Sequence, residues 1–242
     1  MEKEFEYIRL LDANKSEVNK FISENEYVYR YLPLEYFLDM VHNKQLVFSS
    51  PKRWKDPFDS FLFNQRVKNQ NTFLNNIFVT CLTLNPHSEA YWKTYGSNGY
   101  AIRIRLKTYD LFNLLQRLEI KVWFGRLNYL DEKELVTKLT NTIKLKSALE
   151  SNEMEDLFLK IFTLKRTPFE YEKEVRIILE SSPTKDGLKR IKIGLLNDII
   201  NDIYLDPRLK TNEEKALKEY LRQFHINVRQ SQLYRAKNVQ IQ

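Results

Sequence analysis

Two pairs of acidic residues are spaced so that each pair can act together. Asp56 and Asp59 lie three residues apart, and Glu172 and Glu174 lie two apart, just before an apolar run. Carboxylate oxygens are ligands that Mg²⁺ prefers, so one interpretation is a metal-dependent nuclease that uses all four. Two observations weigh against it. Asp-Pro-Phe-Asp favours a turn, and neither glutamate is followed two residues later by the lysine of Asp-Glu-x-Lys nucleases.

Aromatic side chains form a second candidate group. Tyr91, Trp92 and Tyr95 stand at positions i, i+1 and i+4 of a predicted helix, which puts the two tyrosines on one face. Flat rings in such a place can stack on a planar ligand, and they can equally fill a hydrophobic core. The sequence leaves both interpretations open.

Several common chemistries have no support in the sequence. It contains no Gly-rich phosphate loop, no Cys/His cluster and no Ser-His-Asp arrangement, which argues against a kinase, a zinc enzyme and a serine hydrolase. The three histidines, His42, His87 and His225, do not have metal-ligand spacing. The single cysteine, Cys81, lies in a strand-like run and is expected to be a buried structural thiol in a reducing compartment.

The composition predicts one folded domain. Of 242 residues 43% are hydrophobic, enough for a sizeable core, and nothing announces a domain boundary. The acidic N-terminus does not resemble a secretion signal, and no apolar run is long enough to span a bilayer, so we expect a cytoplasmic protein without membrane contact. The net charge of +7 favours contact with nucleic acid, although scattered surface lysines would give the same value.

Alternating and helical patterns predict the elements that must position these groups. Strands separated by helices indicate an α+β fold around a mostly antiparallel, split sheet with flanking helices. A largely helical insertion is expected at about 131–163. Hydrophobic periodicity predicts further helices at 15–25, 33–43, 88–99 and 212–224, and strands at 27–32, 45–49, 77–84, 100–106 and 174–180.

The irregular segment 48–61, FSSPKRWKDPFDSF, predicts a rigid loop. Its aromatic residues are expected to anchor the loop on the core, while Asp56 and Asp59 accept hydrogen bonds from backbone N–H groups around the proline between them. Such a loop can form one wall of a pocket, where Ser49 and Ser50 would offer hydroxyl groups to a ligand. A purely structural loop is the alternative.

Four segments in this order carry a resemblance to a known family. YRYLP, LVFSSPKRWKDPFDS, TCLTLNPHSEAYWKTYGSNGYAIRI and FEYEKEVRIIL, taken together, resemble the bacterial family called domain of unknown function 2971, from about Tyr27 onward. That family name implies no activity.

The order of elements also resembles, more weakly, that of the ADP-ribosyltransferases, which consume NAD. This second resemblance implies an ADP-ribosyltransferase-like core in which Arg30 on the first strand, beside Tyr29, holds NAD. It further implies that Tyr91 or Tyr95 lines the nicotinamide site and that Glu174 completes catalysis. Trp92, Ser49 and Ser50 complete the expected NAD contacts.

The chemistry of NAD cleavage fits these residue types. Breaking the bond between nicotinamide and ribose passes through an oxocarbenium-like state, which a carboxylate such as Glu174 stabilises. Glu172 would orient the acceptor, and the planar guanidinium of Arg30 suits a pyrophosphate. The structural alternatives are a salt bridge between Arg30 and Glu174 and an ion pair between Glu172 and Arg176.

The resulting hypothesis is an enzyme that transfers ADP-ribose from NAD to a macromolecule, with nucleic acid favoured over protein because of the charge. By analogy, such an enzyme would serve as a bacterial toxin or antiviral defence effector, with an antitoxin or regulatory protein as partner. The alternatives are the metal-dependent nuclease and a non-enzymatic binding or regulatory module, which predicts no deep pocket around Glu174.

Overall fold

The computed structural model describes residues 8–9, 15–64, 72–96, 100–145 and 151–234. Its helices are α1 (Lys15–Glu24), α2 (Leu34–Asn43), α3 (Phe61–Asn64), α4 (Thr72–Asn75), α5 (Glu89–Tyr95), α6 (Thr108–Gln116), α7 (Glu132–Leu145), α8 (Ser151–Ile161) and α9 (Thr211–Leu221). No helix within the described ranges is long and apolar enough to cross a membrane.

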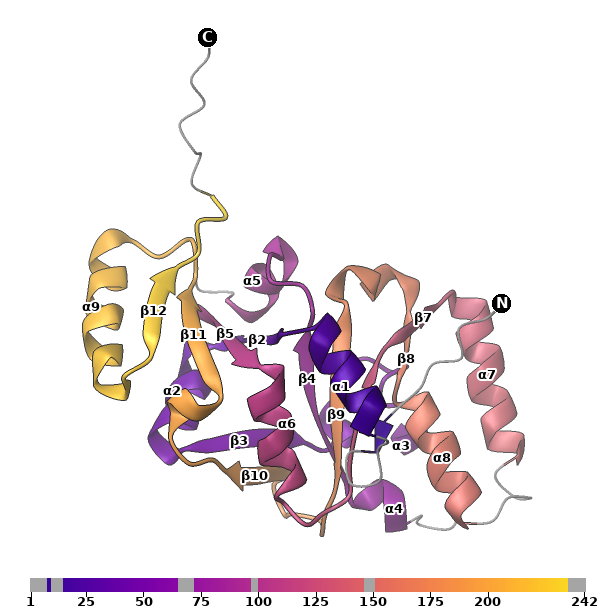
Figure 1. Ribbon diagram of the computed structural model, residues 1–242. Coiled ribbons are helices and arrows are strands. Elements are labelled where there is room, and N and C mark those ends of the chain that lie inside the picture. Colours follow the sequence, from indigo (N-terminus) through magenta and orange to yellow (C-terminus); the bar gives the residue numbers. More distant parts are fainter. Residues whose placement is uncertain (1–7, 10–14, 65–71, 97–99, 146–150, 235–242) are drawn as a thin grey trace.

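The strands divide between one large sheet and one small sheet (Figure 1). The large sheet contains β1 (Ile8–Arg9), β2 (Tyr27–Pro33), β3 (Gln45–Ser49), β4 (Ile77–Thr83), β5 (Ala101–Lys107), β6 (Val122–Arg126), β9 (Glu174–Glu180), β10 (Leu188–Lys192), β11 (Ile200–Leu205) and β12 (Asn227–Gln230). The small sheet pairs β7 (Asn128–Leu130) with β8 (Leu164–Arg166).

The large sheet is split beside β4. Its main path runs β1-β6-β9-β4-β2-β5-β11-β12, while β3 pairs with β10 and also with β4. Strand β2 meets β4 only at Tyr29 with Thr83, and β3 meets β4 only at Ser49 with Val79. Because both strands share the same edge of β4, the sheet opens between them. Every pairing in this sheet is antiparallel except β11 with β12, so the predicted α+β class with a mostly antiparallel sheet is confirmed.

Among the described residues, three hydrophobic clusters hold the helices against the sheet, and the smallest of them, around Tyr31, holds α5. The largest cluster joins α1, α2 and α6 to the sheet strands, with Phe21 and Phe112 of the helices packed on Phe124 of β6. The second cluster joins α7 and α8 to Trp123 and Ile178 on the opposite side of the same strands. Burial of both faces explains why β9 reads EVRIILE, a nearly continuous run of β-branched and apolar residues.

The elements predicted from the sequence agree closely with the structure. The helices expected in 131–163 are α7 and α8, the strand expected at 174–180 is β9, and the other predicted helices and strands all have counterparts within a few residues. Whether 131–163 is an insertion into a single domain stays a prediction. Several elements were not predicted from the sequence: strands β1, β6, β7, β8, β10, β11 and β12, and helices α3, α4 and α6.

Candidate functional site

A cavity of about 450 Å³ lies beside the split in the sheet. It receives side chains from β2, from the loop after β3, from β4 and α5, and from the β8 to β9 region. Arg30, Tyr91, Tyr95, Glu172 and Glu174, all expected in the site, line this one cavity, and so does Tyr29. Segments more than a hundred residues apart in the chain therefore meet at a single place.

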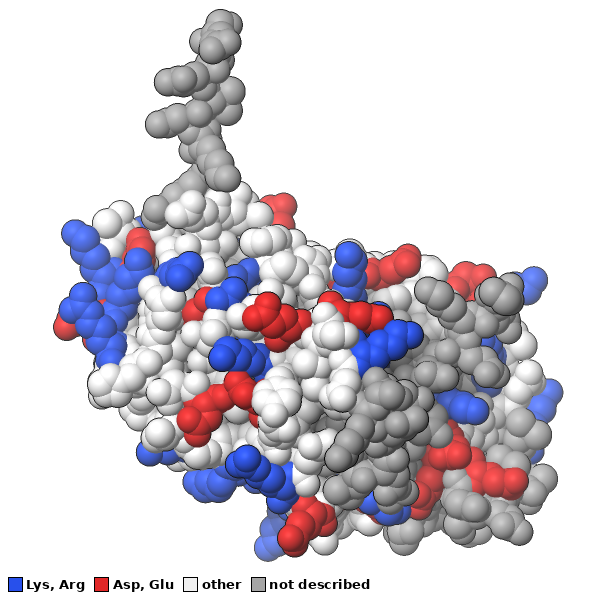
Figure 2. All heavy atoms as spheres, in the orientation of Figure 1, with Lys and Arg blue, Asp and Glu red and all other residues white. Residues whose placement is uncertain are grey.

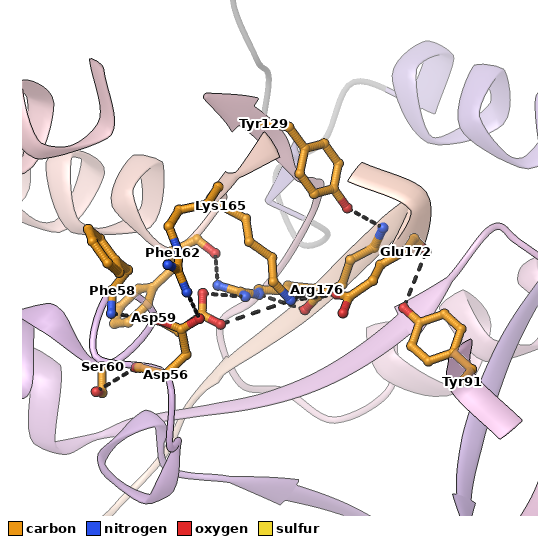
Figure 3. Close-up of polar contacts among 12 residues, drawn as sticks. Asp56, Phe58, Asp59, Ser60, Tyr91, Tyr129, Phe162, Lys165, Glu172 and Arg176 are labelled. Carbon is orange, nitrogen blue, oxygen red and sulfur yellow. Dashed lines mark hydrogen bonds and ion pairs between the residues drawn. The ribbon is translucent and has the colours of Figure 1, made fainter. Parts of the chain in front are cut away.

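The two glutamates belong to a dense network of charges (Figure 3). Arg176 donates from Nε to Oε1 of Glu174 at 2.8 Å, and Lys165 donates to Oε2 of the same carboxylate at 2.7 Å. Lys165 also donates to Oε2 of Glu172 at 2.5 Å. The second guanidinium branch of Arg176 reaches Asp59 at 2.8 Å. Glu174 is thus held between two cations rather than paired with Arg30.

This network sets different protonation properties for the two glutamates. Burial alone would raise the pKa of Glu174, but Arg176 and Lys165 hold that pKa at about 2, so the carboxylate is an anion at neutral pH. Burial raises the pKa of Glu172, and the ammonium of Lys165 offsets only part of this effect. The side chain of Glu174 is 3% exposed and that of Glu172 is 14% exposed. Glu172 is therefore the more accessible and more readily protonated carboxylate.

Arg30 differs from the two glutamates, because no opposite charge among the described side chains forms an ion pair with it. Its guanidinium is half-buried and donates two long bonds of 3.4 Å to the carbonyl of Val47, across the split between β2 and β3. No carboxylate of the described residues forms an ion pair with it. Removal from water lowers the pKa of Arg30, which reflects the cost of holding a charge there without an anion. A guanidinium that lines a cavity in this state is suited to bind an anionic ligand.

The tyrosines of α5 form an aromatic wall with β2. Tyr91 stacks on Tyr31 with ring centroids 4.9 Å apart, and its hydroxyl donates to the carbonyl of Glu172 at 3.3 Å. Tyr95 lies one turn further along α5, with its ring centroid 5.9 Å from that of Tyr91, and part of its side chain is exposed. Ser88 caps the helix by accepting a bond from the Tyr91 N–H. Of the two, Tyr95 has the ring surface that a planar ligand can reach.

Trp92 does not line this cavity, contrary to the expectation from the sequence. It is 1% exposed and packs edge-on against Tyr31, with ring centroids 4.9 Å apart. It follows Tyr91 directly, about 100° further around α5, and its ring is buried against Tyr31 of the sheet. Trp92 therefore fixes the helix on the sheet and has no surface to offer a ligand.

Ser49 and Ser50 do not line the cavity either, although the loop that follows them does. Ser49 ends β3 opposite Leu188, and Ser50 is buried, with its N–H bonded to the carbonyl of Gly187. Both residues lie where β3 ends beside β10, and neither is among the residues that line the cavity. The cavity wall is formed instead by later residues of the same loop: Arg53, Trp54, Lys55, Asp56 and Asp59.

The two aspartates of this loop have different partners. Asp56 accepts a bond from the N–H of Phe58 at 2.8 Å, as predicted, and pairs with Arg166 at 2.8 Å. Asp59 instead pairs with Arg176, whose guanidinium lies 4.6 Å from the ring centroid of Trp54. The loop is therefore joined to the charge network by both aspartates and one aromatic ring.

Lys165 and Arg176 are the central residues that sequence reasoning missed. Arg176 was considered only as a partner of Glu172, and Lys165 was not singled out, because one lysine among 39 basic residues has no local pattern. Its ammonium stays charged: burial opposes the charge, but Glu174 raises the pKa of Lys165 well above its ordinary value. Cys81, expected to be a buried structural thiol, is half-buried and lines the cavity, where burial and the charge of Glu174 raise its thiol pKa.

The four carboxylates first considered as metal ligands do gather around this cavity, but each is already paired with a cation. Asp56 is paired with Arg166, Asp59 with Arg176, and both glutamates with Lys165. Within the described ranges, no group of three or more His, Cys, Asp or Glu side chains has the geometry to hold a metal ion. The arrangement does not favour the nuclease interpretation.

Comparisons with known proteins add a family and two structures. Residues 91–177 match the family described as "Protein of unknown function (DUF2971)", which confirms the resemblance noted in the sequence over that stretch. No curated protein gives a match. Two structures of Thermus sp. 2.9 DarT are similar, one in complex with ADP-ribosylated ssDNA and one with NAD+. The complex with ADP-ribosylated ssDNA has a TM-score of 0.41 and 8% identity, and the match covers 86% of this chain and 95% of the DarT chain. The complex with NAD+ has a TM-score of 0.41 and 9% identity, and the match covers 86% of this chain and 96% of the DarT chain.

Proposed function

We propose that this protein is an NAD-dependent ADP-ribosyltransferase that modifies a macromolecule, with nucleic acid as the acceptor. The observation that carries the proposal is the shared cavity: Arg30, the tyrosines of α5 and Glu174 line it together. An anion site, an aromatic surface and a fixed negative charge are the three elements that binding and cleaving NAD require.

Each group has a distinct role in this proposal. Arg30 binds the pyrophosphate, because it is a half-buried cation without a carboxylate partner among the described residues. Tyr95 stacks on the nicotinamide ring. Glu174, which is ionised and held rigidly by Arg176 and Lys165, stabilises positive charge that develops on the ribose. Because these partners hold the carboxylate before the substrate arrives, little reorganisation is needed in the transition state.

The bond between ribose C1′ and the nicotinamide nitrogen breaks, and nicotinamide leaves with the electron pair. A nitrogen or oxygen of the acceptor donates an electron pair to C1′ and releases a proton. Glu172 is placed to accept this proton, since it is the more accessible of the two carboxylates and burial raises its pKa. By analogy with other ADP-ribosyltransferases, the same proposal includes a role as toxin or antiviral effector, with an antitoxin as partner.

Incubation of the purified protein with labelled NAD and single-stranded RNA or DNA, with and without EDTA, tests the proposal. We expect transfer of label to nucleic acid that resists EDTA and is lost in Glu174→Gln. Cleavage of nucleic acid that needs metal and ignores NAD would establish the nuclease instead. Absence of both activities together with no NAD binding would support a non-enzymatic module.

A further inference from the structure

A second cavity, of about 540 Å³, lies between β11, β12 and α9. Its lining combines the guanidinium groups of Arg103 and Arg229 with the ring of Tyr204 and the apolar side chains of Val228 and Leu233. We call this cavity the C-terminal groove. Its size falls within the ordinary range for small-ligand sites, roughly 300–1,000 Å³.

Strand register places aromatic and basic residues alternately across the sheet beside this groove. Tyr31 of β2 pairs with Arg103 of β5, Arg103 pairs with Tyr204 of β11, and Tyr204 pairs with Arg229 of β12. Directly paired residues point to the same face of a sheet, so the four side chains form one row. The Arg103 guanidinium lies 3.9 Å from the ring centroid of Tyr204, which is a close cation–π contact.

Neither arginine of the groove forms an ion pair with a described residue, although both interact at longer range with the buried carboxylate of Asp202, which pairs directly with Arg105. Arg103 is 3% exposed, has no ion pair with any described residue, and keeps a buried Nε without a hydrogen-bond partner. Arg229 is exposed and forms neither a hydrogen bond nor an ion pair with the described residues. Lys218 differs, because it pairs with Glu214 at 2.6 Å. Figure 2 shows further Lys and Arg side chains gathered on α9, at the left edge of this view.

Only one layer of side chains separates the groove from the first cavity. The hydroxyl of Tyr31, which lines the first cavity, donates to the carbonyl of Pro86 at 3.0 Å. Arg103, which lines the groove, donates to the same carbonyl and lies 5.3 Å from the ring centroid of Tyr29. A molecule in the groove would therefore be a neighbour of a molecule in the first cavity.

We infer that the C-terminal groove binds single-stranded nucleic acid, with a phosphate at Arg229 and a base beside Tyr204 and Arg103. Aromatic rings that stack on bases, next to cations that bind the backbone, are the usual means of holding single strands. In a duplex, pairing with the complementary base would keep a base out of such a recess, so a duplex fits the groove less well than a single strand. Binding of a single strand in the groove does not depend on the cleavage of NAD. Only the delivery of a base from the groove to the first cavity rests on the proposed function.

Binding of labelled single strands of about 12 nucleotides, one of RNA and one of DNA, is measured by fluorescence anisotropy without NAD. Arg229→Glu is expected to weaken binding at least about tenfold, because it removes one phosphate contact and puts a negative charge in its place. The slope of log K against log salt concentration should fall in magnitude by about one or more. Lys218→Ala is expected to have a smaller effect, because Glu214 already neutralises that lysine. The control is Arg117→Glu, which makes the same change of charge at an exposed residue that follows α6 and lines neither cavity.

The outcomes separate this inference from the proposed function. Loss of binding in Arg229→Glu but not in Arg117→Glu, with unfolding midpoints unchanged, supports the groove as the site even if NAD is never cleaved. Equal losses in both variants would mean diffuse attraction to a basic surface, and no loss in Arg229→Glu, or no binding by the unaltered protein, would overturn the site. Equally tight binding of a matched duplex would overturn the assignment to single strands.

Discussion

Lys165 donates hydrogen bonds from one ammonium group to two carboxylates, to Glu172 at 2.5 Å and to Glu174 at 2.7 Å. Glu174 has a second cation in Arg176, whereas Glu172 has only this lysine as an ion-pair partner among the described residues. Loss of Lys165 should therefore change the ionisation of Glu172 more than that of Glu174. The relationship gives the first prediction.

Lys165→Met removes the positive charge that lowers the pKa of Glu172, so that pKa, already raised by burial, should rise further. If Glu172 must be ionised to accept a proton from the acceptor, transfer of ADP-ribose to nucleic acid falls as pH drops through its pKa, and this acid limb moves to higher pH in the variant. The pH profile of kcat/KM measures the shift. Lys160→Met, at an exposed position of α8, is the control and should leave the limb in place. An unmoved limb in Lys165→Met would contradict the role of Glu172.

The Arg30→Ala variant tests whether Arg30 binds an anionic ligand or has only a structural role. Because Arg30 is half-buried and has no ion pair with the described residues, its removal should leave the unfolding midpoint unchanged or raise it. The affinity for NAD, measured by calorimetry, should fall by at least about tenfold, since a charged hydrogen bond contributes roughly 1.5–3 kcal/mol. A lower midpoint with unchanged NAD affinity would show that Arg30 only joins β2 to β3.

The sequence predicted the elements that local patterns encode. Strand β9 was clear because it is buried on both faces and so contains a continuous apolar run, and α5 was clear from its spacing of aromatic residues. Strands β10 and β12 were missed because LKRIK and NVRQ are short and largely polar or charged, and their strand conformation depends on distant partners.

The site could be predicted only in part, and for a related reason. A family resemblance proposed Arg30, Tyr91 and Glu174, which the structure brings to one cavity. No local signal marks Lys165, because its partnership with Glu174 depends on how β8 lies against β9. Ser49 and Ser50 were expected to line the cavity but do not, and the strand pairings that decide where β3 ends have no sequence pattern.

Asp56 tests whether the loop at 48–61 is mainly structural. Asp56→Ala removes an acceptor for the Phe58 N–H and the partner of Arg166, so the free energy of unfolding should fall by about 1–3 kcal/mol. Asp56→Asn keeps an oxygen for the N–H and should lose less. Denaturant titration gives both values. Equal stability of Asp56→Ala and the unaltered protein would refute the structural role.

The last prediction concerns Glu174, whose negative charge is both structural and, in our proposal, catalytic. Glu174→Gln keeps the shape of the side chain but leaves Arg176 and Lys165 without their shared counter-charge in a buried place. The free energy of unfolding should therefore fall, on the order of 3 kcal/mol as for other broken buried pairs. Assays of this variant must be run well below its unfolding midpoint.

Under those conditions the turnover of NAD should fall roughly a hundredfold or more, the scale of losing one positioned electrostatic group, while NAD affinity stays within about tenfold. Glu172→Gln is the matched comparison: it should impair transfer to nucleic acid but leave simple hydrolysis of NAD nearly intact. The pH dependence also distinguishes the two. With a pKa of about 2 against an ordinary 4.5, Glu174 adds stability above pH 4.5 that is lost as pH falls toward 2. A Glu174→Gln protein that turns NAD over normally would remove this residue from the mechanism, whatever its effect on stability.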